Sequence, residues 1–150
     1  MNRHPPLIQF ITKKYPNSKI LGIDLLDLKI PKNKNTDFLK QDLNNFEEIS
    51  GYISDKKLNF DNIISDIAPN TSGIQSVDQN KSYQLCEICF AFVDEHLKTN
   101  GNFLIKNFQG EDTPLLFNTI KKKFNKAIYV KPKASEKISK EIYILALSKK

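Results

Sequence analysis

The sequence has no long apolar run and few cysteines or glycines. None of its apolar stretches approaches the ~18 consecutive residues that a membrane-spanning helix needs. Its first residues, MNRHPPLIQF, also lack the charged, apolar and small-residue regions of a secretory signal peptide. We therefore expect a cytoplasmic protein with no membrane partner.

The two cysteines, Cys86 and Cys89, form a single CxxC motif. A structural zinc site needs a second pair of ligands, and the sequence has neither another cysteine pair nor a nearby group of histidines. The surrounding segment, QLCEICFAF, favours a helix, in which positions three apart share one face. The pattern predicts two buried core thiols rather than metal ligands.

The five glycines are scattered along the chain. They are Gly22, Gly51, Gly73, Gly101 and Gly110. No pair or triplet of them forms the G-x-G-x-x-G fingerprint that lets a backbone approach a dinucleotide pyrophosphate. A nicotinamide-dependent oxidoreductase is therefore disfavoured.

The composition is that of one globular domain with a basic surface. The chain of 150 residues is 39% hydrophobic, which is enough for one core and too short to expect two. We therefore expect residues 1–150 to form a single domain. Lys and Arg total 23 against 17 Asp and Glu, a formal net charge of +6. This excess suits a polyanionic partner such as RNA, although basic charge alone does not identify one.

Strand-like and helix-like segments alternate along the chain. Apolar periodicity and breaker residues predict helices at 6–15, 46–53, 81–98 and 114–124, and strands at 19–25, 37–42, 59–67, 101–108, 127–130 and 141–147. Such alternation is typical of an α/β fold with a mainly parallel sheet. The segment between the last two strands is short for a crossover helix, so we expect an antiparallel element at the sheet edge.

Charged residues stand at the ends of several predicted strands, where ligands bind in parallel α/β sheets. They are Asp24, Asp42, Asp66 and Lys106. Any one of them alone could be a solvated cap. Asp66 and Lys106 directly continue apolar runs and should be partly buried, which a charge tolerates when it is paired. Such a pair could position a reacting group or accept a proton, and the residues alone leave both roles open.

Three motifs in the sequence together resemble one known family. They are SDIAPNTSG at 65–73, FLIKNFQGE at 103–111, and KPKAS followed by SKEIYILAL at 131–147. They closely resemble the FtsJ/RlmE family of S-adenosylmethionine-dependent ribosomal RNA 2′-O-methyltransferases, from about residue 19 to the C-terminus. The resemblance implies a Rossmann-like methyltransferase sheet with an antiparallel C-terminal strand. It also implies S-adenosylmethionine as cofactor and ribosomal RNA or the large ribosomal subunit as partner.

The resemblance assigns roles to particular residues. In the family's Lys-Asp-Lys-Glu catalytic set, Asp66 matches the aspartate, Lys106 the second lysine and Glu141 the glutamate that opens the last strand. The implied reaction is 2′-O-methylation of a ribose, expected to be that of a uridine, with Lys106 as candidate base and Asp66 orienting both lysine and cofactor. Asp24 matches the acid that binds the cofactor ribose, and Asp42 the acid that contacts the adenine amino group.

Two features of the family pattern are not found in this sequence. Family members begin with a segment resembling R-S-R-A-Y-K-L, which carries the first catalytic lysine, and continue with a strand and a D-L-G-x-x-P-G-G-W loop. The resemblance therefore implies an FtsJ-type domain that lacks its N-terminal part and the first, central strand of its sheet. We expect a complementing N-terminal fragment as a partner. The alternative is a non-catalytic RNA-binding remnant or a subunit that requires such a fragment.

Overall fold

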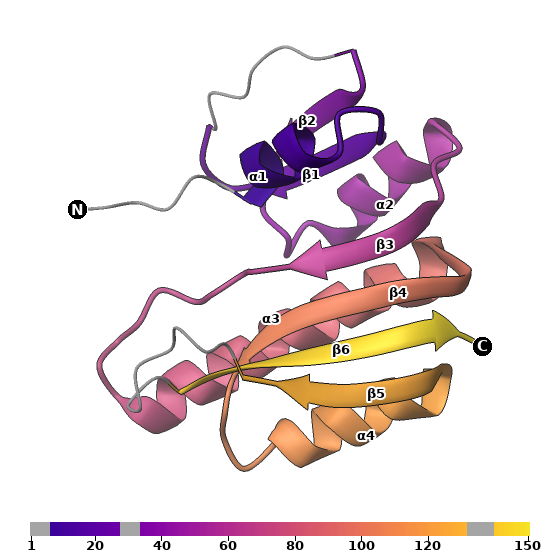
Figure 1. Cartoon of the computed structure of the whole chain (residues 1–150). Coiled ribbons are helices and arrows are strands. Elements are labelled where there is room, and N and C mark those ends of the chain that lie inside the picture. The colour runs from indigo at the N-terminus through magenta and orange to yellow at the C-terminus, as the bar shows by residue number, and fades with distance from the viewer. Residues whose placement is uncertain (1–6, 28–33, 132–139) are drawn as a thin grey trace. The chain divides into compact units, whose positions relative to one another are not determined.

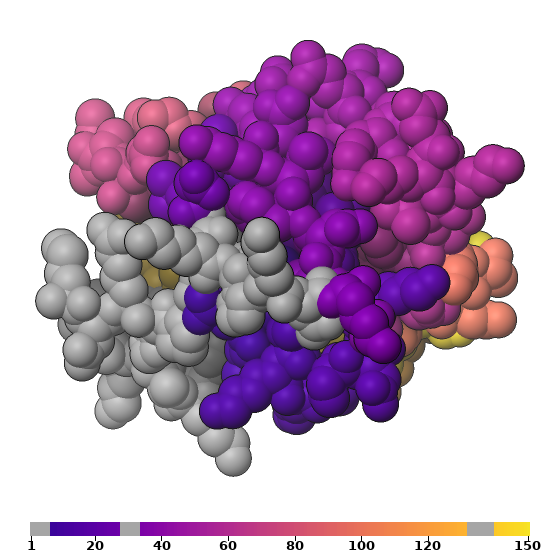
Figure 2. All heavy atoms as spheres, turned by 90° about the horizontal axis from the view of Figure 1, so that it is seen from above, coloured from indigo at the N-terminus to yellow at the C-terminus, as the bar shows by residue number. Residues whose placement is uncertain are grey.

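The computed structural model describes residues 7–27, 34–131 and 140–150. Part of the third sequence motif, at 132–139, lies outside the described residues. The chain divides into two compact units, Met1–Ile49 and Ser50–Lys150. Unit 1 forms the indigo to purple part of the space-filling view in Figure 2. No helix in the described ranges is long and apolar enough to cross a membrane.

Unit 1 contains a two-stranded parallel sheet and one short helix. Its elements are α1 (Leu7–Lys14), β1 (Ile20–Asp24) and β2 (Thr36–Lys40), and α2 (Phe46–Asp55) begins in unit 1 and ends in unit 2. A Cβ atom on Gly22 of β1 would collide with the Ile8 side chain. The missing side chain at position 22 therefore leaves the space in which Ile8 of α1 packs on the strand. The predicted helices and strands of this part of the chain are confirmed.

Unit 2 contains a four-stranded mixed sheet. Its elements are β3 (Phe60–Ser65), α3 (Gln75–His96), β4 (Leu97–Phe108), α4 (Thr113–Lys123), β5 (Phe124–Val130) and β6 (Glu141–Lys149). The strands lie side by side in the order β3-β4-β6-β5 (Figure 1). β3 and β4 are parallel, whereas β6 is antiparallel to both of its neighbours. The predicted mainly parallel sheet with an antiparallel C-terminal strand is confirmed.

The expected edge position of the antiparallel element is wrong. β6 lies between β4 and β5, and β5 forms the edge of the sheet. The burial of the two strands explains this order, because β6 is buried or half-buried along its whole length whereas most residues of β5 are exposed. A continuous apolar run such as IYILAL is typical of an internal strand.

Helices α3 and α4 cover one face of the sheet of unit 2 (Figure 1). On this face the side chains of β4 and β6 are fully buried. They are Phe103, Ile105, Ile144 and Ala146. Cys86 and Cys89 of α3 are free and buried, as predicted. Burial raises the pKa of Cys86 to about 12 and that of Cys89 to about 11, so both remain protonated thiols of the core.

Helix α3 ends earlier than predicted. The helix predicted to end at residue 98 ends at His96, and the strand predicted to begin at residue 101 begins at Leu97. Leu97 is buried and pairs with Phe60 of β3, and the register then shifts before Asn62. Asn100 has a φ of 64°, and a Cβ on Gly101 would lie 2.7 Å from Leu97 Cδ1. The Asn-Gly pair therefore forms an irregularity inside β4 rather than a helix cap.

The sheets of both units have unpaired edges. Within the described residues, β1 pairs only with β2, and β3 pairs only with β4. Each strand therefore offers one row of backbone N–H and C=O groups without a neighbouring strand. The missing central strand that the family resemblance implies stays a prediction.

Lys149 of β6 caps the C-terminus of α3. Its ammonium donates hydrogen bonds of 2.7, 2.9 and 3.0 Å to the carbonyl oxygens of Val93, Asp94 and Leu97. A cation at this end of a helix also interacts favourably with the helix dipole. We expect Lys149→Met to lower the free energy of unfolding by about 1 kcal/mol in urea titrations. Lys126→Met, which changes an exposed residue of β5, should have almost no effect; equal losses in the two variants would contradict the capping role.

Candidate active site

Lys106 is a buried cation at the C-terminal end of β4. Only 8% of the residue is exposed. Its neighbours in sequence, Ile105 and Asn107, are buried on the face that α3 and α4 cover, so the pleat directs Lys106 to the opposite face. Lys106 Nζ lies 3.1 Å from Asp66 Oδ1 and 3.7 Å from Glu141 Oε1. Two carboxylates thus compensate one buried ammonium group.

The strand order explains how residues far apart in sequence meet. β4 lies between β3 and β6, so its end is flanked on one side by Asp66, just after β3, and on the other by Glu141, the first residue of β6. Both acids are more exposed than the lysine, at 51% of the side chain for Asp66 and 40% for Glu141. The cluster therefore has its cation inside and its carboxylates facing solvent, where a substrate could reach them.

Tyr143 joins this cluster and was missed by the sequence analysis. It is the residue of β6 directly opposite Lys106, and its hydroxyl donates a hydrogen bond of 2.9 Å to Asp66 Oδ1. Burial, followed by the hydrogen bond to Asp66 and the charges of Asp66 and Glu141, raises the pKa of Tyr143 to about 12. The available signal was the two-residue period of the strand, which places Tyr143 on the same face as Glu141.

The loop of the SDIAPNTSG motif is anchored to α3 by Asp78. Asp78 is buried, and its Oδ1 accepts hydrogen bonds from Ser72 N at 2.7 Å and Ser72 Oγ at 2.8 Å. Gly73 follows with a φ of +83°, in the left-handed region that favours glycine. These contacts allow α3 to begin at Gln75, well before the predicted start at residue 81. The loop that follows Asp66 is therefore fixed at its far end.

We expect Asp78→Asn to weaken the fold in a pH-dependent way. The hydrogen bonds from Ser72 backbone and side chain hold the pKa of Asp78 below its ordinary value of 3.8. Its stabilising contribution is therefore fully present above that value and is lost as the pH falls through the lower, folded-state pKa. In thermal unfolding, the variant should melt below the wild type at about pH 7, and the gap should narrow at about pH 3. A gap that is the same at both pH values would contradict this assignment.

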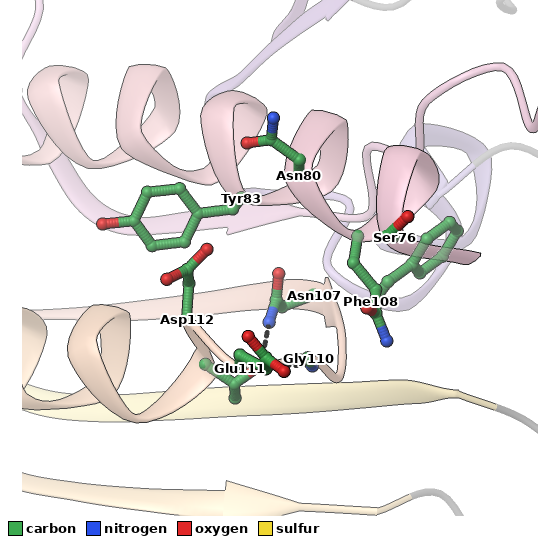
Figure 3. A pocket seen from close by; sticks show the side chains of 10 residues that line it. Ser76, Asn80, Tyr83, Asn107, Phe108, Gly110, Glu111 and Asp112 are labelled. Atoms are coloured by element: carbon green, nitrogen blue, oxygen red, sulfur yellow. Dashed lines mark hydrogen bonds between the residues drawn. The ribbon is translucent and has the colours of Figure 1, made fainter. Parts of the chain in front are cut away.

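A buried polar network supports the turn between β4 and α4. Asn107, which is 1% exposed, donates from Nδ2 to Thr113 Oγ1 at 2.9 Å, and Thr113 Oγ1 also accepts from Gly110 N at 2.9 Å. Ser82 of α3 donates to Asn107 Oδ1 at 3.3 Å. Figure 3 shows Asn107 between α3 and this turn. The network ties the residue after Lys106 to two helices.

The same turn borders a small polar pocket (Figure 3). Its cavity volume is about 190 Å³, and its lining includes Asn80 and Tyr83 of α3 and Asp112 of the turn. It lies on the face of the sheet that carries the helices, because Asn107 contributes to its lining. The pocket is therefore separate from the cluster around Lys106, which lies on the opposite face.

The two remaining predicted residues, Asp24 and Asp42, lie at one end of the sheet in unit 1. Asp24 ends β1, and its backbone carbonyl accepts a hydrogen bond of 3.0 Å from Gln41 N, next to Asp42. Oδ1 of Asp24 accepts from Leu26 N at 2.9 Å, and Oδ1 of Asp42 accepts from Asn44 N at 2.9 Å. Within the described residues, the second oxygen of each carboxylate accepts no hydrogen bond and can take a donor from a ligand.

The structure thus gives two clusters of candidate residues. It brings Lys106, Asp66 and Glu141 together in unit 2, and it places Asp24 and Asp42 at one sheet end in unit 1. No group of His, Cys, Asp and Glu in the described ranges is arranged to hold a metal ion. These residues offer carboxylate oxygens that accept hydrogen bonds and one buried lysine beside two of those carboxylates.

Known proteins are similar to this chain over most of its length. A ribosomal RNA large subunit methyltransferase E from Desulfatibacillum aliphaticivorans is 37% identical over 134 residues, covering 89% of this chain and 64% of the relative. The protein of the same name from Bdellovibrio bacteriovorus is 39% identical over 137 residues, covering 88% of this chain and 67% of the relative. The chain therefore spans about two thirds of the length of these relatives.

Solved structures share the fold. A ribosomal RNA methyltransferase from Plasmodium falciparum superposes with a TM-score of 0.80 at 22% identity, covering 95% of this chain and 79% of the other. Human methyltransferase-like protein 13, solved in complex with SAH, gives a TM-score of 0.67 at 12% identity, covering 95% of this chain and 66% of the other.

The family model described as FtsJ-like methyltransferase matches residues 7–149. This chain belongs to the FtsJ-like methyltransferase family.

Proposed function

We propose that this protein uses S-adenosylmethionine to methylate the 2′-oxygen of a ribose, that of a uridine, in large-subunit ribosomal RNA in the cytoplasm. The observation that carries the proposal is the buried Lys106 with Asp66 and Glu141 on either side. A ribose hydroxyl must lose its proton when its oxygen is methylated, and the Lys106 amine can accept that proton once its ammonium form, which the two carboxylates favour, has released one to solvent. The relatives' names, which refer to methylation of ribosomal RNA, support the substrate class.

Each residue of the cluster has a distinct proposed role. Lys106, once it has lost its own proton, would accept that of the 2′-hydroxyl. S-adenosylmethionine, when bound, would supply the methyl group, whose bond to sulfur would break as its bond to the ribose oxygen forms, leaving S-adenosylhomocysteine. Asp66 orients the lysine, and Glu141 approaches Nζ from the other side and helps to hold both lysine and ribose. Methyl transfer requires the oxygen, carbon and sulfur to be nearly collinear, so fixing the acceptor supplies much of the catalysis.

The residues of unit 1 fit the nucleoside end of the cofactor. Asp24 and Asp42 each have one oxygen fixed by a backbone N–H and a second oxygen able to accept. Such acceptors suit donors of the kind found on a ribose diol and on an adenine amino group. We propose that Asp24 binds the ribose hydroxyls, that Asp42 contacts the adenine, and that Asp66 also contacts the cofactor.

We further propose that units 1 and 2 belong to one FtsJ-type domain, which a complementing N-terminal fragment would complete. The family model matches across both units, which supports a single domain over residues 1–150. The unpaired edges of β1 and β3 could each accept a further strand. The sequence has no glycine-rich loop to approach the methionine end of the cofactor, so such a fragment would supply it.

A non-catalytic RNA-binding role is the alternative. It is favoured by the net charge of +6 and by three consecutive lysines, Lys121 to Lys123, which are exposed in the last turn of α4. Such lysines can bind RNA phosphates electrostatically, and this binding requires no catalysed reaction. Calorimetric titration of S-adenosylmethionine, with and without the candidate N-terminal fragment, separates the two roles: micromolar affinity in either case supports a methyltransferase, whereas no binding at millimolar cofactor in both supports the alternative.

Transfer of a labelled methyl group tests the proposal directly. The chain is incubated with labelled S-adenosylmethionine and either protein-free RNA or intact large subunits, with and without a candidate N-terminal fragment. Digestion to nucleosides and mass spectrometry should find 2′-O-methyluridine. Label on a base, or on no nucleoside under any of these conditions, would overturn the proposed reaction.

A further inference from the structure

Tyr143 contacts the catalytic cluster but has no role in the proposed reaction. It lies opposite Lys106 in the register of β4 and β6. Its hydroxyl donates to Asp66 Oδ1 at 2.9 Å, and Lys106 Nζ lies 3.1 Å from the same oxygen. One carboxylate oxygen therefore receives two donors, which come from adjacent strands of the sheet.

Asp66 needs such a contact because its own surroundings fix it weakly. It follows the last residue of β3, and 51% of its side chain is exposed. An exposed carboxylate can rotate and exchange its partners for water, and holding it in one rotamer costs conformational entropy. Tyr143 projects from β6, which is paired on both sides, so its position is set by the sheet.

We propose that Tyr143 is a positioning residue for methyl transfer, whose hydroxyl holds Asp66 with Oδ1 directed at Lys106. This inference rests on the proposed function. Tyr143 acts through Asp66 and takes no part in bond making. If Asp66 turned away, the amine would lose the partner that sets its direction toward the acceptor hydroxyl.

The hydroxyl can fill this role only while it carries its proton. Among the described residues, the charged and titratable groups around it are Asp66 after β3, Lys106 on β4 and Glu141 on its own strand. Burial, the hydrogen bond to Asp66 and the two nearby carboxylates raise the pKa of Tyr143 to about 12. Tyr143 therefore remains a donor at neutral and mildly alkaline pH.

A tyrosine titration tests the contact without requiring activity. With tyrosine labelled at ¹³Cζ, NMR should give a pKa of about 12 for Tyr143 in the wild-type chain. In Asp66→Asn the value should fall toward the ordinary 10.0, because the charge that disfavours the phenolate is gone. Tyr129, whose pKa is raised by burial alone, is the internal control and should not move. An ordinary pKa for wild-type Tyr143, or no change in Asp66→Asn, overturns the inference.

A double-mutant cycle tests the positioning role. Tyr143→Phe should lower the single-turnover rate by about tenfold, the loss expected for one hydrogen bond to a charged group, with KM for RNA and for cofactor unchanged. In an Asp66→Ala background the same change should have no further effect, because the oxygen to which Tyr143 donates is already removed. Tyr129→Phe, which removes a hydroxyl on β5, should leave the rate unchanged.

The outcomes separate this inference from the proposed function. If Tyr143→Phe has the wild-type rate, or slows the reaction equally in both backgrounds, Tyr143 does not act through Asp66 and the proposed function is unaffected. If the wild-type chain, with any fragment it needs, methylates no ribose, the proposed function fails. The tyrosine titration then decides by itself whether Tyr143 holds Asp66.

Discussion

Replacing Lys106 with alanine should lower the rate of methyl transfer by about 10³-fold, within the range typical of losing a general base. The amine is the basic group at the centre of the cluster, with Asp66 at 3.1 Å and Glu141 at 3.7 Å. Single-turnover assays with saturating RNA measure the chemical step. Affinity for RNA should be nearly unchanged, because a residue that is only 8% exposed presents little surface to a phosphate backbone.

Two further variants separate a base from a positioning cation. Lys106→Arg keeps a positive charge beside the two carboxylates but cannot release its proton near neutral pH, so it should be as inactive as Lys106→Ala. Lys98→Ala is the matched control, since it removes another lysine of β4 that pairs with an acid, Asp61, at the exposed surface. It should retain activity. An active Lys106→Arg would show that the cation positions the substrate and that another group takes the proton.

The sequence predicted most helices and strands, and the pairing of Asp66 with Lys106, because both follow from local patterns. Apolar residues that alternate with polar ones, or that follow one another almost without interruption, predict strands β1, β3, β4 and β6. A charge that continues such a run, as Asp66 and Lys106 do, stands out because burial of a lone charge is costly. The acid at the start of β6 could be assigned only through the family resemblance.

The features that were missed depend on contacts between distant residues. Tyr143 gains its role from Asp66, 77 residues earlier in the chain. The early start of α3 depends on Asp78 and Ser72, whose polar side chains interrupt any apolar period. The place of β6 inside the sheet is likewise set by pairing with strands that precede it: its apolar run is typical of an internal strand but does not specify which strands lie beside it.

Asn107 is the residue whose removal should most weaken the fold beside the site. It is 1% exposed, and its amide joins β4 to Ser82 of α3 and to Thr113 of α4. Asn107→Ala would leave the Ser82 hydroxyl without its acceptor and a cavity in the sheet-helix interface. We expect the free energy of unfolding to fall by about 3 kcal/mol, which lowers the melting temperature by about 10 °C.

Two companion variants show whether the loss comes from the network. Asn125→Ala removes an exposed asparagine of β5 and should change stability by less than about 0.5 kcal/mol. Thr113→Val removes the hydroxyl that Asn107 contacts, so the double variant Asn107→Ala/Thr113→Val should lose less stability than the sum of the two single changes. Strict additivity would mean that the two residues act separately. If the two changes are not additive, the same hydrogen bonds hold both the turn that follows Lys106 and the two helices. Unfolding and loss of methyl transfer should then occur together as temperature rises.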